Sequence, residues 1–480
     1  MPNTLPKDDP PLPFLFLERM QQLLKEDYPA FLSSYAEAPK VGLRVNTLKI
    51  SIRDFGTISP YPLEPVPWCS SGFIVPETDP LEEKIPFGKH PYHIAGLFYL
   101  QEPSAMLPPE MLNPQPDERV LDLAAAPGGK TTHLAALMQN QGLLVANEIH
   151  PKRVWELVRN LERCGVCNAV VTNETPERLA QNLEGFFDKV LVDAPCSGEG
   201  MFRKNPRARL EWKPNVVIGC AARQRVILET AARLVRLGGC LLYSTCTFSP
   251  EENEGVLTRF LADHPEFEIV NVPRQESFLP GRPDWVGPAA PLELTHAVRL
   301  MPHKSLGEGH FAVLLRKKVG SQSKTPPANR PARIPHSNLR AFAEFCENAL
   351  TDQGRDKVLR SGRLALLGTY LYLLPPNPPD WRGLRVIHPG WWLGRYRKNR
   401  FEPSHALARG LTSQDTRTRL DLGLEDARLE TYLHGKNISL NRENNSSAWI
   451  LVTLEGHPLG WGKAVGNVLK NCYPHGLRLV

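Results

Sequence analysis

The feature that most constrains the fold is a regular alternation of short apolar runs and helical stretches between about residues 92 and 316. Helical patterns separate the runs, most clearly over residues 152–164 and 220–237. Strands that alternate with helices form a largely parallel sheet with helices on both faces. The rhythm therefore predicts an α/β domain with a Rossmann-like, doubly wound sheet, whose apolar runs are residues 120–123, 143–146, 169–171, 190–192, 240–243 and 311–315.

Smaller modules are predicted on both sides of this domain. Residues 14–35 have the pattern of amphipathic helices, and residues 43–50 alternate as a strand does. Residues 317–337 are rich in proline, serine and basic residues, which is typical of a linker. We expect an N-terminal α+β module at 1–91, the doubly wound domain at 92–316, the linker at 317–337, an intermediate domain at 338–400 and a C-terminal α+β or β module at 401–480.

The composition is typical of an intracellular enzyme. The 480 residues are 41% apolar and 22% charged, which suits a globular protein of several domains. Nine cysteines, a small and odd number, favour free thiols in a reducing compartment. No signal-peptide pattern opens the chain, and the longest apolar run, residues 364–374, is too short to span a membrane. We therefore expect a cytoplasmic protein that does not enter a membrane.

A loop of small residues follows the first strand of the predicted sheet, where only small side chains let a ligand approach the backbone. One hypothesis is a phosphate-binding loop, because Gly129, Lys130 and Thr131 fit that motif and Asp193 could hold its magnesium ion. Against it, Ala124 replaces the first glycine and Pro127 lacks an amide hydrogen. Glu148, after the second strand, favours instead a nucleoside cofactor whose ribose hydroxyls it can hold. The loop comprises Ala124, Ala125, Ala126, Pro127, Gly128, Gly129 and Lys130.

Two cysteines follow strand-like runs in the same domain. Cys196 lies in Asp-Ala-Pro-Cys-Ser-Gly, after the run that ends at Asp193, and Cys246 lies in Ser-Thr-Cys-Thr, just after the run at 239–243. Because the carboxyl ends of parallel strands meet at one edge of a sheet, the two thiols predict an active site there. Cys164 and Cys167 have the spacing of metal ligands but lack a second cysteine or histidine pair, so no metal site is expected.

These motifs resemble those of the S-adenosylmethionine-dependent RNA 5-methylcytosine methyltransferases of the RsmB/RsmF type, in the NOP/Sun family. The C-terminal segment 458–478 resembles the PUA-like tail of the RsmF-like subgroup, which modifies small-subunit ribosomal RNA. The resemblance implies S-adenosyl-L-methionine as cofactor, RNA or the small ribosomal subunit as partner, and RNA-binding modules at both ends; we expect a monomer. The matching segments keep the family's order and spacing, at residues 43–48, 93–106, 124–130, 193–200 and 244–247.

The resemblance also implies a role for each site residue. Cytosine C5 can accept a methyl group only after a nucleophile adds at C6, which a thiolate can do. The family assigns Cys246 as this nucleophile and Cys196 as the group that helps release the product; the residues alone do not order the two. Asp193 is expected to hold N3 and the exocyclic amine of the base, and Lys130 is a candidate for ionising Cys246. The loop 124–130, Glu148 and Asp193 are expected to bind the cofactor.

Some questions stay open at this stage. Many family members have an adenine-contacting aspartate where this chain has Asn173 and Glu174, and either could substitute. Basic residues and aromatics are interleaved at 201–213 and 391–400, which predicts contacts with RNA. The alternatives to a ribosomal RNA methyltransferase are a transfer RNA cytosine-C5 methyltransferase, a P-loop nucleotide hydrolase and a non-catalytic RNA-binding protein of ribosome assembly.

Overall fold

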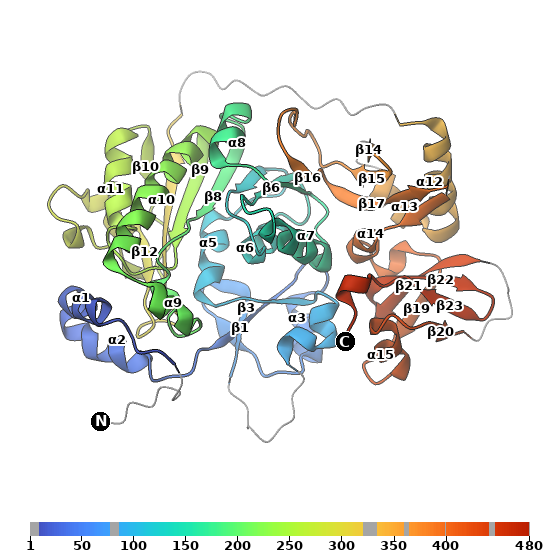
Figure 1. Ribbon diagram of the computed structural model, residues 1–480, viewed down its shortest axis with the longest axis horizontal. Coiled ribbons are helices and arrows are strands. Elements are labelled where there is room, and N and C mark those ends of the chain that lie inside the picture. Colours follow the sequence, from blue (N-terminus) through green and yellow to red (C-terminus); the bar gives the residue numbers. More distant parts are fainter. Residues whose placement is uncertain are drawn as a thin grey trace.

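A ten-stranded sheet forms the centre of the computed structural model (Figure 1). The structure describes residues 9–76, 86–319, 334–359, 364–398, 400–440 and 447–479. The sheet order is β11-β12-β13-β9-β8-β5-β6-β7-β16, with β10 beside β13. The five strands from β9 to β7 are parallel, which confirms the doubly wound fold, and the flanking strands are antiparallel. These five are β5 (Arg119–Asp122), β6 (Leu143–Asn147), β7 (Ala169–Thr172), β8 (Phe187–Asp193) and β9 (Val235–Thr245).

Helices cover both faces of this sheet. Neighbouring strand residues point to opposite faces, so Val190 belongs to one apolar cluster and Leu191 to another. The first face is covered by α8 (Pro176–Asn182), α10 (Pro214–Leu234) and α11 (Glu254–Asp263). The second face is covered by α5 (Leu107–Leu112), α6 (Gly129–Leu137) and α7 (Arg153–Cys164). The antiparallel strands on the flank are β10 (Phe267–Ile269), β11 (Leu279–Pro280), β12 (Val298–Leu300) and β13 (His310–Lys317).

The N-terminal module contains a four-stranded antiparallel sheet of order β2-β3-β1-β4. Its last strand, β4 (Phe98–Leu100), lies beyond residue 91, where the sequence predicts the end of the module. The domain boundary itself stays a prediction. The two predicted amphipathic helices are present, but they pack on the central domain, where Phe16 and Phe31 meet Phe202 and Phe248. The other elements are α1 (Phe14–Leu24), α2 (Tyr28–Ser34), β1 (Val41–Val45), α3 (Ile52–Ile58), β2 (Glu64–Val66), β3 (Cys69–Val75) and α4 (Pro91–Ile94).

Two further sheets form the C-terminal part of the molecule. The first is antiparallel, with the order β14-β15-β17-β18, and the second has the order β19-β21-β22-β23-β20. Most of the expected linker at 317–337 lies outside the described residues. One strand of this part, β16 (Val386–His388), pairs with β7 and so extends the central sheet. The remaining strands are β14 (Leu364–Leu367), β15 (Tyr370–Leu373), β17 (Trp391–Arg397), β18 (Arg400–Pro403), β19 (Arg419–Leu422), β20 (Ile438–Ser439), β21 (Ala448–Leu454), β22 (His457–Val465) and β23 (Val468–Asn471).

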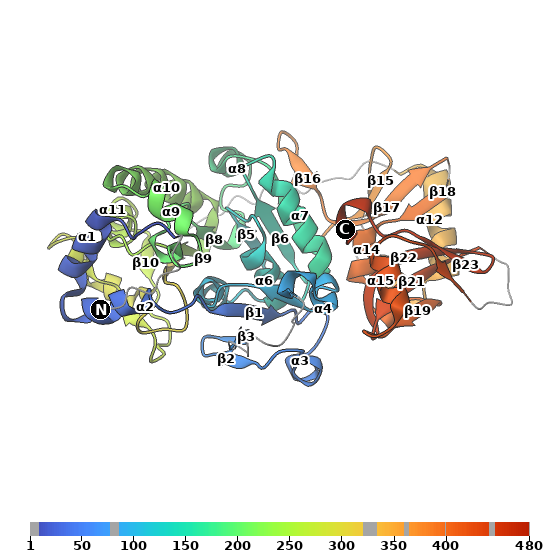
Figure 2. The same cartoon turned by 60° about the horizontal axis from the view of Figure 1, so that its bottom comes forward.

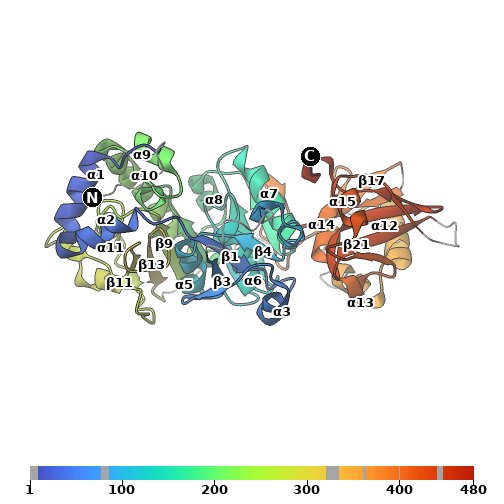
Figure 3. The ribbon, with the colours of Figure 1, turned by 90° about the horizontal axis from the view of Figure 1, so that it is seen from below.

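The C-terminal part packs directly against the N-terminal module and the central domain. Figures 2 and 3 show α14 (His405–Gly410) between α7 and the C-terminal sheets. Arg409 on α14 is buried and donates to the carbonyl oxygens of Pro458, Ile94 and Arg163, which belong to all three parts. The other C-terminal helices are α12 (His336–Ala349), α13 (Asp352–Leu359) and α15 (Ala427–Leu433). None of the helices in the described ranges is both long and apolar enough to cross a membrane.

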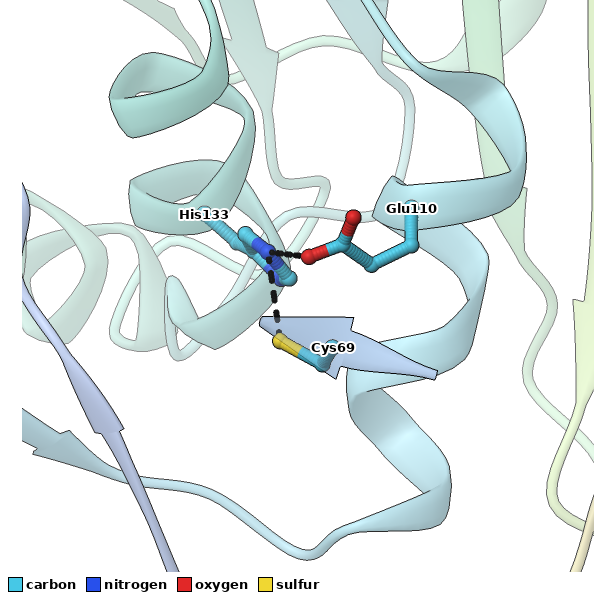
Figure 4. A group of neighbouring side chains, drawn as sticks. All are labelled: Cys69, Glu110 and His133. Atoms are coloured by element: carbon cyan, nitrogen blue, oxygen red, sulfur yellow. Dashed lines mark hydrogen bonds and ion pairs between the residues drawn. The ribbon is translucent and has the colours of Figure 1, made fainter. Parts of the chain in front are cut away.

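A buried polar cluster joins the N-terminal module to the central domain (Figure 4). His133 Nε2 lies 2.9 Å from Glu110 Oε1 and 3.8 Å from Cys69 Sγ. Burial raises the pKa of Cys69 to about 12, and burial together with Arg44 lowers the pKa of His133 to about 4. The cluster therefore consists of a thiol, a neutral imidazole and a carboxylate whose charge Arg44 balances. Its hydrogen bonds connect the N-terminal module to the central domain.

Candidate active site

Four parallel strands bring the predicted site residues to one edge of the central sheet. β5, β6, β8 and β9 end there, and each is followed by one predicted segment: the loop at 124–130, Glu148, Cys196 and Cys246. The register pairs Asp193 directly with Ser244 across β8 and β9. The structure therefore brings together residues that are more than 120 positions apart in the chain.

The two thiols are in contact. Cys196 Sγ lies 3.3 Å from Cys246 Sγ, and both cysteines are half-buried. Ser197 fixes the loop that carries Cys196, because its backbone N–H and its hydroxyl both donate to the Glu252 carboxylate. Glu252 is fully buried and also accepts a hydrogen bond of 2.8 Å from Gln224. The position of Cys196 is thus set by a buried carboxylate that sequence reasoning missed.

The environments of the two thiols differ. The hydrogen bond with Cys246, burial and the nearby charge of Glu252 raise the pKa of Cys196 well above its usual value. Burial opposes the positive charge of Lys130, but Asp193, with a smaller contribution from Cys246, outweighs burial and raises the pKa of Lys130. The two thiols therefore lie in different surroundings: Cys196 is close to the Glu252 carboxylate, whereas Cys246 is close to the Lys130 cation.

Asp193 is held by three side chains. Lys130 Nζ donates to Asp193 Oδ2 at 2.6 Å, and Ser244 Oγ donates to Asp193 Oδ1 at 2.9 Å. His310 Nε2, on the buried end of β13, lies 3.6 Å from Asp193 Oδ1. Burial alone would raise the pKa of Asp193, but Lys130 and His310 outweigh it and hold that pKa far below the usual range. Sequence reasoning missed His310; its signal was a polar residue at the end of the strand that pairs with the Cys246 strand.

Hydrogen bonds with β6 and α7 hold the small-residue loop in place. The Ala125 N–H donates to Asn147 O at 2.8 Å, while Arg153 on α7 donates to Ala126 O at 2.7 Å. Gly128 has φ 110° at the start of α6, and a Cβ there would lie 3.1 Å from Leu157 Cδ1. A residue other than glycine is strained at this φ. The small residues from Ala124 to Gly129 leave the backbone of the loop open to a ligand, which fits a nucleoside cofactor.

Glu148 is buried beside this loop. Its Oε1 accepts a hydrogen bond of 2.8 Å from the His150 N–H, and its Oε2 lies 3.6 Å from Arg153 Nη1. Asn173 donates to Glu148 O at 2.6 Å, and Glu174 accepts from the Arg385 N–H at 2.6 Å. Both candidates for the adenine contact thus already have partners, and Glu174 links the cofactor edge to the segment before β16.

The basic run at 201–213 is largely structural. Arg203 is buried and paired with Glu308 at 2.7 Å, and Arg209 is buried and donates to the Phe202 carbonyl oxygen at 2.8 Å. Phe202 and Trp212 lie in the apolar cluster beneath α1. The prediction that this run contacts RNA is therefore wrong for these four residues. Its exposed or half-exposed cations are Lys204, Arg207 and Lys213.

The run at 391–400 divides in a similar way. Trp391 is buried and donates to the Ala406 carbonyl oxygen at 3.0 Å, so its ring is not available to a base. Arg395, Arg397, Lys398 and Arg400 are exposed, and Arg395 pairs with Glu402 at 2.9 Å; Asn399 lies outside the described residues. For this run the predicted RNA contact stays a prediction that rests on these four cations.

Family models match four consecutive segments of the chain. The model of 16S rRNA methyltransferase RsmB/F matches residues 109–316, and the N-terminal domain of 16S rRNA methyltransferase RsmF matches residues 12–103. The first C-terminal domain of the RsmF rRNA methyltransferases matches residues 344–411, and the methyltransferase RsmF PUA domain matches residues 419–479. The loop at 124–130 lies inside the methyltransferase match, which argues against the alternative of a P-loop nucleotide hydrolase.

Individual proteins agree with this assignment. The ribosomal RNA small subunit methyltransferase F of Vibrio vulnificus (strain YJ016) is 35% identical, over 97% of this chain and 97% of the relative. That of Enterobacter sp. (strain 638) is 33% identical, over 96% and 95%. A methyltransferase homologue from Pyrococcus horikoshii has a solved structure with 33% identity and a TM-score of 0.56, covering 63% of this chain and 94% of its own. The chain belongs to the RsmF family of ribosomal RNA small subunit methyltransferases.

Proposed function

We propose that this protein transfers a methyl group from S-adenosyl-L-methionine to C5 of a cytosine in 16S ribosomal RNA. The observation that carries the proposal is the pair of thiols 3.3 Å apart at the ends of neighbouring strands, next to the Lys130–Asp193 ion pair. Family membership supports an RNA methyltransferase, and two thiols match the need of C5 chemistry for one group that attacks and one that assists release. We also propose that the enzyme acts as a cytoplasmic monomer.

Cys246 is the proposed nucleophile. Its thiolate adds to cytosine C6, and the electron pair of the C5–C6 bond becomes available at C5 for attack on the methyl carbon. S-adenosylmethionine, when bound to the loop at 124–130 and to Glu148, supplies that electrophilic methyl group. The Lys130 cation lies near Cys246, and its positive charge stabilises the negative charge that develops on the ring.

Cys196 is proposed to act after methyl transfer. Bonding of Cys246 to C6 removes the hydrogen bond that contributes most to the raised pKa of Cys196, and Cys196 then loses its proton to solvent. The Cys196 thiolate then accepts the C5 proton, the C5–H electron pair restores the C5–C6 double bond, and Cys246 leaves as a thiolate. The buried Ser197–Glu252 contact holds Cys196 in reach of both atoms.

Asp193 is proposed to bind the base through its exocyclic amine. Because Lys130 and His310 keep the carboxylate ionised, it can accept a hydrogen bond but has no proton for N3. Of the two contacts expected for Asp193, with N3 and with the exocyclic amine, we therefore propose only the contact with the amine. This contact selects cytosine over uracil, which has a carbonyl oxygen in that place.

Bisulfite sequencing tests the proposed function. The purified protein, S-adenosylmethionine and 16S RNA transcribed in vitro should produce one or more protected cytosines, which are absent with the Cys246→Ala variant. The same reaction on assembled small subunits and on total transfer RNA identifies the substrate. If cytosines are protected only in transfer RNA, transfer RNA and not 16S RNA is the substrate. If no cytosine is protected in either RNA or in the subunits, the result favours the non-catalytic alternative.

A further inference from the structure

A cavity of about 320 Å³ lies where the three parts of the molecule meet. It is lined by the second half of α7, by α4, by α14 and by the chain end around Tyr473 and Leu477. Figure 2 shows α7 and α4 facing α14 at this junction. The cavity is separate from the thiol site, because none of its lining residues comes from the strand ends that carry Cys196 and Cys246.

Positive charge gathers around this cavity without a matching number of carboxylates. Arg159 and Arg163 line it, and the half-buried Lys49 and the buried Arg409 lie close to its His405. Burial, with the neighbouring Arg409, lowers the pKa of Lys49 well below its usual value. Within the part of the chain that the structure describes, no carboxylate forms an ion pair with any of the four; Lys49 and Arg409 donate to carbonyl oxygens and Arg163 donates to Asn160 Oδ1. The single carboxyl group in the lining, Glu162, is half-buried, and its burial raises its pKa to about 7.

The lining also holds polar atoms without partners. Arg163 Nε and His405 Nδ1 are buried and have no hydrogen-bond partner among the described residues. Burial and the neighbouring Arg163 lower the pKa of His93 to about 3, and burial, Arg409 and Lys49 lower the pKa of His405 well below its usual value. Both imidazoles are therefore neutral, chiefly because they are buried, with a smaller contribution from the neighbouring cations.

We propose that this cavity binds a phosphate group of the RNA backbone, through Arg159 and Arg163. The proposal rests on the proposed function for the identity of the polyanion. A phosphodiester would supply the anion that Arg159 and Arg163 lack. Arg159 is exposed at the mouth and has no partner among the described residues, so it is the group that solvent-borne RNA meets first. The cavity joins the PUA-matching segment to the methyltransferase domain, so one bound phosphate would fix the RNA relative to both.

Salt-dependent binding of RNA tests this proposal. The probe is a labelled 16S RNA transcript, and its dissociation constant is measured from low to high salt for the whole chain and for Arg159→Gln. A lost phosphate contact should weaken binding about 3- to 10-fold near physiological salt and reduce the slope of log K against log salt by about 0.7. An Arg163→Gln variant should add to both effects. The neighbouring Asn160 donates to Pro127 O in the cofactor loop, so S-adenosylmethionine binding is measured in parallel as a check that the loop is intact. It should not change.

A matched control is Arg259→Gln on α11, an exposed arginine that pairs with Asp263 on the same helix. It should leave the slope unchanged. An unchanged slope in Arg159→Gln, or tight binding of adenosine monophosphate that RNA does not displace, would overturn the proposal; the second result would assign the cavity to a free nucleotide. Methylation is scored separately: if the parent protein does not methylate C5 but Arg159→Gln still reduces the slope, the proposed function fails and this site stands.

Discussion

The contact between Cys196 and Cys246 leads to a prediction for single residues. Cys246→Ala should abolish methylation and form no covalent species, because nothing adds to C6. Cys196→Ala should still form the bond to C6 but fail to release it, so a slowly migrating protein–RNA band should accumulate on a denaturing gel when S-adenosylmethionine is present. Cys472→Ala, an exposed thiol in the C-terminal part, is the control and should behave as the parent. A band in Cys246→Ala would reverse the two roles.

Asp122, at the end of β5, gives a pH-dependent prediction. Burial raises its pKa to about 7, so between pH 4 and 7 the folded protein binds a proton that the unfolded chain has lost. Stability from this group is therefore present at low pH and is lost as the pH rises through about 7, by an amount on the order of a few kcal/mol. Asp122→Asn removes the dependence. Its Tm relative to the parent should increase from pH 5 to pH 8; a constant difference would contradict the assigned cause.

The position of the loop that carries Cys196 depends on the Glu252 side chain, which is remote in the sequence. Glu252→Gln replaces a carboxylate that accepts from the Ser197 N–H, the Ser197 hydroxyl and Gln224. We expect kcat to fall about 10- to 100-fold, since a displacement of about 1 Å in a reacting group can have an effect of this size. The KM for S-adenosylmethionine should not move. Glu251→Gln, at an exposed neighbour that pairs with Arg19, is the control.

The elements also show what sequence patterns can and cannot predict. Strands of the central sheet, the small-residue loop and both cysteine segments follow from local patterns, because hydrophobic period and turn residues act over a few positions. The burial of Arg203 does not, since its partner Glu308 is 105 positions away. A basic run with aromatics has the same composition whether its side chains face RNA or, as with Phe202 and Trp212, fill a core.

For the whole molecule, Arg409 is a single side chain that links all three parts. Arg409→Met would leave the carbonyl oxygens of Pro458, Ile94 and Arg163 without their donor in a buried place. The expected cost is about 2–5 kcal/mol, because each unsatisfied buried group costs about 1–3 kcal/mol and the site can relax. Calorimetry should resolve an early transition in which the C-terminal part separates. A single transition at the parent temperature would show that the apolar contacts alone hold the parts together.

The first turn of α6 is fastened at four consecutive residues to four different elements. Lys130 bonds Asp193 on β8, Thr131 bonds Asp122 on β5, Thr132 accepts from Arg44 on β1, and His133 contacts Glu110 on α5. These contacts hold the cofactor loop in its final conformation before any ligand binds. Association of S-adenosylmethionine should therefore follow a single exponential whose rate rises linearly with concentration, without the plateau that a slow rearrangement imposes.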